Sequence, residues 1–205
     1  MQPFTVLTAI AAPYDRLNVD TDQILPARFL LKRRTDPQYP TYLFRDLRLK
    51  ADGRESADFV LNHPAYRAAK IFVGNANFGG GSSREAAAIA FDRYGFRCVI
   101  AVNFGDIFFN NCVKNGILPV RLPEATTAAL RNQLHAKPGS TLTVDLPAQT
   151  VTDVEGKQHA FDIDGFSKSC LIEGASQIDL TLRRLDVIEA FEQRYAATMS
   201  WADVR

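Results

Sequence analysis

Residues 74–91, GNANFGGGSSREAAAIAF, contain the residue types that bind and process an anion. Gly79, Gly80 and Gly81 carry no Cβ, so their backbone N–H groups can approach a ligand closely and point together. The helix predicted to begin after them adds the positive end of its dipole, and Arg84 adds a guanidinium suited to a carboxylate. The segment therefore predicts a carboxylate-binding loop.

Ser82 has two interpretations at this stage. A hydroxyl is a weak base at neutral pH, but converging N–H groups and a helix dipole would stabilise its alkoxide, and such a group could remove a proton next to a carboxylate. Alternatively, Ser82 caps the helix and Glu85, three residues on, completes a capping box. A cap does not need three flexible glycines before it, which favours the chemical interpretation.

Two other chemistries do not fit this loop. A P-loop needs a lysine after its glycines, and the dinucleotide motif G-x-G-x-x-G needs a glycine where this chain has Arg84. Nucleotide binding is therefore disfavoured. A serine–histidine–aspartate triad is also unsupported, because each histidine lies outside a triad context and is expected at the surface or in a structural role: His63, His135 and His159.

Composition and charge restrict the class further. The 205 residues include 24 Lys and Arg against 23 Asp and Glu, for a net charge of +1, so neither nucleic acid nor an acidic membrane is an expected partner. No apolar stretch approaches the roughly 20 residues of a membrane span. Phe4 to Ala12 has no basic residue before it and is expected to be a strand rather than a signal peptide. Cys98, Cys112 and Cys170 fit neither a disulfide framework nor a metal or cluster site, which favours the cytoplasm.

The middle of the chain alternates short apolar runs with helical patterns, as a parallel sheet with crossover helices requires. We expect strands at 71–73, 98–102 and 117–120, and helices at 83–94, 106–115 and from 123 to about 135. Gly95 and Gly116 follow two of these helices, where a C-terminal cap belongs.

The last third predicts two or three antiparallel strands, with a turn at Glu155, Gly156 and Lys157, as a second sheet layer. Two helices are expected to close the chain, around 166–173 and from about 183 to 199. Residues 32–58 show no sustained period and are longer than most structureless connections, so we interpret them as a functional loop. The whole chain, 1–205, is expected to form one α/β domain with a mixed sheet.

Three blocks of sequence carry a resemblance to a known family. NVDTDQILPARFL, NFGGGSSRE and VNFGDIFFNNCVKNGILPV stand in the order and spacing of the aconitase superfamily swivel domain, most similar to the small-subunit family of bacterial 3-isopropylmalate dehydratases, and the likeness covers nearly the whole chain. It implies a three-layer β/β/α swivelling domain. It also implies a hydro-lyase that isomerises 2- and 3-isopropylmalate by dehydration and rehydration in leucine biosynthesis. The partner implied is a large subunit that holds a [4Fe-4S] cluster, in a heterodimer or higher assembly, with no cofactor in this chain.

The resemblance also implies roles for individual residues. Ser82 matches the family's catalytic base, and Ser83 and Arg84 match residues that hold a substrate carboxylate. The other implied site residues are Thr21, Asp22 and Ile24 beside the active site, Arg34 as a substrate-binding arginine with Arg33 as the adjacent alternative, and Gly80 and Gly81 as substrate-contacting backbone. For Asp22, an Asx-turn that caps the chain after a strand is an equal alternative. Asn111 fits a supporting role and a hydrogen-bonded core role equally well.

Two positions depart from the family pattern. Gly80 stands where the family usually has Cys, and Ala86 where it usually has His. These departures leave two alternatives open: a divergent paralogue acting on another hydroxy-diacid of the citramalate or methylmalate type, and a catalytically silent binding module.

Overall fold

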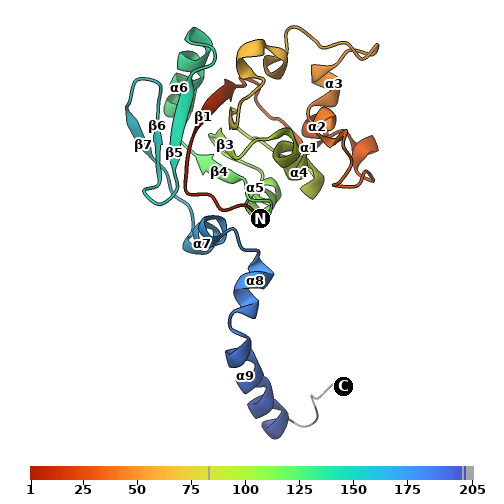
Figure 1. Cartoon of the computed structure of the whole chain (residues 1–205), viewed down its shortest axis with the longest axis vertical. Coiled ribbons are helices and arrows are strands. Elements are labelled where there is room, and N and C mark those ends of the chain that lie inside the picture. The colour runs from red at the N-terminus through yellow and green to blue at the C-terminus, as the bar shows by residue number, and fades with distance from the viewer. Residues whose placement is uncertain (83, 200, 202–205) are drawn as a thin grey trace.

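Seven strands form one mixed sheet in the computed structural model, which describes residues 1–82, 84–199 and 201 (Figure 1). The parallel strands are β1 (Val6–Pro13), β2 (Ile71–Val73), β3 (Cys98–Ala101) and β4 (Leu118–Arg121). The antiparallel strands are β5 (Thr141–Asp145), β6 (Thr150–Thr152) and β7 (Gln158–Ala160). Their order across the sheet is β4-β3-β2-β1-β5-β6-β7, and the strands predicted from the sequence are confirmed.

Strand β1 joins the two halves of this sheet. Val6 to Ile10 pair antiparallel with β5, whereas Ala11 to Pro13 pair parallel with β2. The antiparallel strands expected in the last third are therefore continuous with the parallel sheet rather than separate from it. Because β1 and β2 are parallel neighbours, the chain leaves both strands at the same edge of the sheet.

Three helices connect or follow the parallel strands: α4 (Glu85–Tyr94), α5 (Asp106–Lys114) and α6 (Glu124–Ala136). All three predicted helices are confirmed. Helix α4 ends at Gly95, whose φ of 111° is in the left-handed region that glycine adopts without strain. Its apolar face, from Ala87 to Phe91, is buried, and Phe91 packs edge-on against Phe72 of β2 at 5.2 Å between ring centroids.

The segment 32–58 is more ordered than its sequence indicates. It contains helices α2 (Tyr39–Tyr42) and α3 (Arg45–Arg48), shown in orange in Figure 1 beside α1 (Thr21–Ile24). The expectation of an irregular loop is wrong here, because a cluster of aromatic and aliphatic side chains anchors the segment in the core: Tyr39, Tyr42, Leu43 and Phe44. Tyr39, Tyr42 and Leu43 have the i, i+3, i+4 spacing of a helix face, but the helix is only four residues long, so the pattern is not sustained over the window that a periodicity test needs.

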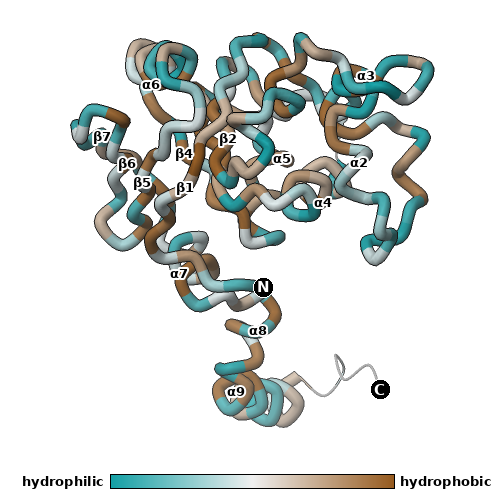
Figure 2. Tube along the Cα trace, turned by 45° about the horizontal axis from the view of Figure 1, so that its top comes forward, coloured by the Kyte–Doolittle hydropathy of each residue, from teal (hydrophilic) through white to brown (hydrophobic). Residues whose placement is uncertain are grey.

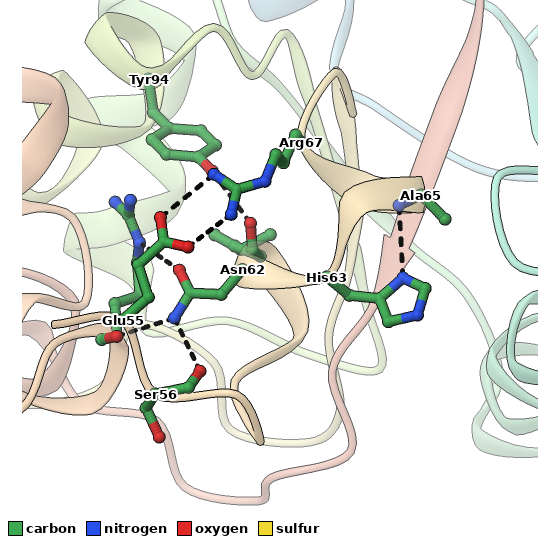
Figure 3. A network of polar contacts seen from close by, with 9 residues as sticks. Glu55, Ser56, Asn62, His63, Ala65, Arg67 and Tyr94 are labelled. Atoms are coloured by element: carbon green, nitrogen blue, oxygen red, sulfur yellow. Dashed lines mark hydrogen bonds and ion pairs between the residues drawn. The ribbon is translucent and has the colours of Figure 1, made fainter.

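A polar network fastens the far end of this segment (Figure 3). The buried Asn62 donates from Nδ2 to the carbonyl oxygens of Arg48, at 2.7 Å, and Ser56, at 2.8 Å. Glu55 forms an ion pair with Arg67 in the same network. The segment is thus held at its centre and at its far end, while its first residues and residues 50–55 stay exposed.

Three helices close the chain: α7 (Gly165–Glu173), α8 (Gln177–Leu182) and α9 (Leu185–Thr198). Helices α7 and α9 are confirmed, whereas α8, which begins at a Ser176–Asp179 capping box, was not predicted. Helices α8 and α9 extend away from the sheet (Figure 1), and we call residues 177–199 the C-terminal arm. Every residue of α9 is exposed or half-buried. Among the helices described, none combines the length and apolar character of a membrane span.

Candidate active site

The candidate site lies where the chain leaves β1 and β2. The backbone N–H groups of Gly79 and Gly80 both donate to the carbonyl oxygen of Val19, at 2.7 and 3.2 Å, and the N–H of Thr21 donates to the Gly80 carbonyl oxygen at 2.9 Å. Asp20 and Gly80 form an isolated parallel bridge. Two sequence blocks about sixty residues apart, both predicted to belong to the site, are thereby joined edge to edge.

Packing explains why this loop is rich in glycine. Gly79 has a φ of 71°, and a Cβ there would lie 2.6 Å from the Cβ of Phe108 and closer still to its ring. Gly81 has a φ of 91°. A side chain at Gly105 would lie 2.5 Å from the Gly79 carbonyl oxygen. The loop therefore needs glycine for its conformation and its close contact with α5.

One sequence-based expectation about the loop is wrong. We expected all three glycines to present N–H groups to a ligand, but Gly79 and Gly80 use theirs on Val19. Gly80 also uses its carbonyl oxygen on Thr21, so its position in the loop is fixed by backbone bonds on both sides. Substrate contact by Gly80 and Gly81 stays a prediction.

The structure separates Ser82 from the start of the helix. Helix α4 begins at Glu85 with Arg84 as its N-cap residue, so the capping box expected from Ser82 and Glu85 is wrong. Ser82 is exposed, and its carbonyl oxygen accepts a hydrogen bond of 3.1 Å from the hydroxyl of the buried Thr21. Thr21 therefore holds the serine backbone in place and leaves its hydroxyl at the open surface. Ser83 lies outside the described residues.

Asp22 and Arg84 form an ion pair across the two blocks. The Asx-turn considered for Asp22 is wrong, because Asp20 is the N-cap residue of α1 and its Oδ1 accepts from the N–H of Gln23 at 2.7 Å. Asp22, two residues later, does not cap the helix and instead pairs with Arg84. The Arg84 guanidinium is mostly buried, whereas the Asp22 carboxylate is exposed.

Arg34, from the segment after α1, also reaches the loop. Its Nη2 donates to Oε1 of Glu85 at 2.6 Å, and Nδ2 of Asn115 donates to the same oxygen at 3.2 Å. Burial raises the pKa of Glu85, but the hydrogen bonds from Arg34 and Asn115 outweigh it and leave the pKa below its ordinary value. Arg33 and Leu31 line a hollow of about 410 Å³ on the same segment, and the arginine that bonds to the motif is Arg34.

Sequence reasoning missed one residue near this site. Asn115 carried only the signal of a helix end, because its contact with Glu85 spans thirty residues.

The two departures from the family pattern occupy different settings. A Cβ at Gly80 would lie 3.3 Å from Oδ1 of Asn77, so a larger residue there requires a small shift of that amide. Asn77 is itself held by a 3.0 Å hydrogen bond to Asn18. Ala86 is half-buried against the core.

All three cysteines of this chain are buried, and burial raises the pKa of the Cys98 and Cys112 thiols above the ordinary value. Within residues 1–82, 84–199 and 201, no three side chains of His, Cys, Asp or Glu are grouped to hold a metal ion.

The mixed sheet and the meeting of these loops define a protein of the aconitase C-terminal domain class, whose family model matches residues 1–125. Two further models match in succession: LeuD_N over residues 128–165, and the C-terminal domain of the 3-isopropylmalate dehydratase small subunit over 178–205. The chain belongs to the family of 3-isopropylmalate dehydratase small subunits. The resemblance noted in the sequence and the expected fold class are confirmed.

Individual relatives agree over almost the full length. The 3-isopropylmalate dehydratase small subunit of Paramagnetospirillum magneticum is 48% identical over 202 residues, covering 98% of this chain and 100% of the relative. That of Brevibacillus brevis is 46% identical over 194 residues, covering 95% and 100%. The crystal structure of a 3-isopropylmalate dehydratase from Methanocaldococcus jannaschii superposes with a TM-score of 0.65 at 24% identity, covering 90% of this chain and 99% of that one, and shares the fold.

Proposed function

We propose that this chain acts as the small subunit of a cytoplasmic hydro-lyase that isomerises 2-isopropylmalate and 3-isopropylmalate in leucine biosynthesis. The observation that carries the proposal is the position of Ser82. It is exposed where the segments leaving β1 and β2 meet, just ahead of α4, with Arg84 and Arg34 each paired to a carboxylate nearby.

In this proposal Ser82 is the base. Its alkoxide takes the proton from the carbon next to a substrate carboxylate, the C–H electron pair forms the double bond, and hydroxide leaves the neighbouring carbon. The N-terminus of α4 stabilises the alkoxide electrostatically. Departure of hydroxide calls for a Lewis acid, which we assign to a [4Fe-4S] cluster on a large partner subunit. Returning the proton to the carbon that lost hydroxide, and hydroxide to the carbon that lost the proton, gives the isomer.

Arginines Arg84 and Arg34 would bind the two substrate carboxylates. Arg84 is paired with Asp22, and Arg34 with Glu85. When substrate binds, each arginine would therefore either bind the substrate carboxylate beside its protein carboxylate or exchange one for the other. The buried Arg84 would fix the carboxylate next to the reacting carbon, because its partly desolvated charge gives a strong, directional contact. Ser83, which lies outside the described residues, would assist it.

Leu31 would contact the isopropyl group of the substrate. It is the apolar side chain beside the arginines, and its full exposure leaves it available to a ligand or a partner surface. Discrimination by such contacts is worth about 1–3 kcal/mol per methylene-sized change. The segment that contains Leu31 and Arg34 would therefore determine which malate derivatives bind, including those of the citramalate and methylmalate types.

The C-terminal arm supports the assignment of a large partner subunit. Hydrophobic and hydrophilic residues are mixed along helices α8 and α9 (Figure 2). The exposed apolar side chains of these helices include Ile178, Leu182, Leu185, Val187, Phe191 and Tyr195. An isolated helix as short as α9 is only marginally stable in water, so we expect another protein surface to bury its apolar face. We assign that cover, and completion of the open site around Ser82, to the large subunit in a heterodimer or higher assembly.

The test is reconstitution. The purified chain is mixed anaerobically with a cluster-loaded large subunit, and formation of the unsaturated intermediate from 2- and 3-isopropylmalate, citramalate and methylmalate is followed by absorbance. Ser82→Ala should lower kcat by several orders of magnitude without loss of complex formation or of Tm. Ser169→Ala, an exposed serine on α7, is the matched control and should behave as the unaltered protein. A stable complex with no turnover of any of these acids would instead establish a binding module.

A further inference from the structure

We infer that Glu85 and Asn115 are positioning residues that hold the Arg34 guanidinium ready for a substrate carboxylate, an inference that rests on the proposed function. The starting point is the setting of Arg34. Its side chain is 52% exposed and comes from the surface part of the segment after α1. A long side chain in that setting samples many rotamers unless something holds it, and each rotamer lost on binding weakens affinity.

Glu85 restrains this side chain. Its Oε1 accepts from Nη2 of Arg34 at 2.6 Å, which joins the half-exposed arginine to the first residue of α4, three residues after Ser82. A guanidinium has five N–H donors, and a single contact through Nη2 leaves the others for a ligand. Glu85 can therefore orient Arg34 without occupying it fully.

Asn115 fixes Glu85 in turn. Its Nδ2 donates to the Asn111 carbonyl oxygen at 2.8 Å, at the end of α5, and to Oε1 of Glu85 at 3.2 Å. A primary amide has two hydrogens, so it can make both bonds at once. The chain Asn115–Glu85–Arg34 thus transmits the rigidity of two helices to one exposed guanidinium.

The charge on Glu85 is maintained by the same contacts. Burial raises the pKa of this carboxyl, and the hydrogen bonds from Arg34 and Asn115, with the charges of Arg34 and Lys114, lower it to below the ordinary value. Glu85 is consequently ionised at neutral pH and binds Arg34 by a charge-assisted hydrogen bond.

The variants Glu85→Gln and Asn115→Asp test this arrangement in the reconstituted complex. Glu85→Gln keeps the shape but loses the charge, and Asn115→Asp places a second carboxylate against Glu85. Both should raise KM for isopropylmalate roughly tenfold while kcat stays within about threefold, because binding is weakened and the base is untouched. In an Arg34→Ala background, Glu85→Gln should cause no further rise in KM, since the two residues act as one unit.

Glu124→Gln is the matched control. Glu124 is likewise the first residue of a helix, α6, and is exposed, and it lies outside the segment 32–58. The KM of this control variant should stay at the value of the unaltered protein. If Glu85→Gln leaves KM at the control value, or lowers it because Glu85 competes with substrate, the inference is wrong. An unaltered complex without any turnover would instead count against the proposed function, and Tm values identify any variant that fails to fold.

Discussion

Replacement of Gly79 by alanine tests how the core positions the active-site loop. Gly79 has a φ of 71°, and a Cβ there would lie 2.6 Å from the Cβ of Phe108, with the Phe108 ring nearer still. Phe108 is fully buried and packs against Phe78 and Phe91, so it has no room to withdraw. The alanine methyl group must therefore displace the loop or the helix.

Two effects set the size of the loss. A left-handed conformation costs an L-residue about 1–2 kcal/mol, and forcing an extra methyl group into a packed core costs about 1–3 kcal/mol more. Gly79→Ala should therefore lower the free energy of unfolding by about 2–5 kcal/mol, a large part of the roughly 5–15 kcal/mol typical of a folded protein. For a chain of this length, that corresponds to a fall in Tm of roughly 10 °C.

Thermal and urea unfolding followed by circular dichroism measure this difference. Gly80→Ala is the control, because Gly80 has an ordinary φ and its new Cβ would meet only Oδ1 of Asn77 at 3.3 Å, so its stability should change by less than about 1 kcal/mol. Gly79→Ala combined with Phe108→Leu should lose less than the sum of the single variants, since the smaller side chain relieves the contact. A Gly79→Ala protein with the Tm of the unaltered chain would refute this account of the loop.

Three further predictions concern other parts of the molecule. Leu31→Asp should raise KM for 2-isopropylmalate by about tenfold or more and affect citramalate less, because the smaller acid lacks the isopropyl contact; equal effects on both acids in a steady-state assay would contradict the assigned contact. Phe191→Asp should weaken association with the large subunit at least tenfold in analytical ultracentrifugation, whereas Glu192→Gln on the same helix should not; unchanged association of the Phe191 variant would show that the arm is not covered by the large subunit. Burial raises the pKa of Asp153, but hydrogen bonds, led by that from His159, lower it below the ordinary value. The ionised Asp153 carboxylate should therefore stabilise the fold above about pH 4, and this contribution to the free energy of unfolding should be lost as the pH falls through the lowered pKa. Asp153→Asn should show a flatter acid-unfolding profile than the unaltered chain.

Much of the fold follows from local sequence patterns. The short apolar runs at 71–73 and 98–102 are strands, and the helical pattern before Gly95 ends at that glycine. Each of these outcomes depends on spacing and residue type within a dozen residues, which a sequence displays directly. The glycine-rich motif before α4 and its family resemblance were visible for the same reason.

The local patterns failed where the buried run was too short to show a sustained period. The segment 32–58 has the composition of a loop, yet Tyr39 and Phe44 anchor it in the core. The C-terminal arm shows the reverse: Leu185 and Phe191 have helical spacing that normally indicates a buried face, and they are exposed. Amphipathic spacing predicts a helix, but only the neighbouring elements decide whether its apolar face is covered.

The sequence by itself determined which residue types stand in the candidate site and on which elements most of them lie. Tertiary structure alone decided their partners: Gly79 and Gly80 bond to Val19, Asp22 pairs with Arg84, and Glu85 holds Arg34 instead of closing a capping box. The physical reason is that a hydrogen bond depends on distance and angle in space. Groups dozens of residues apart acquire those only after the sheet has brought the ends of β1 and β2 together.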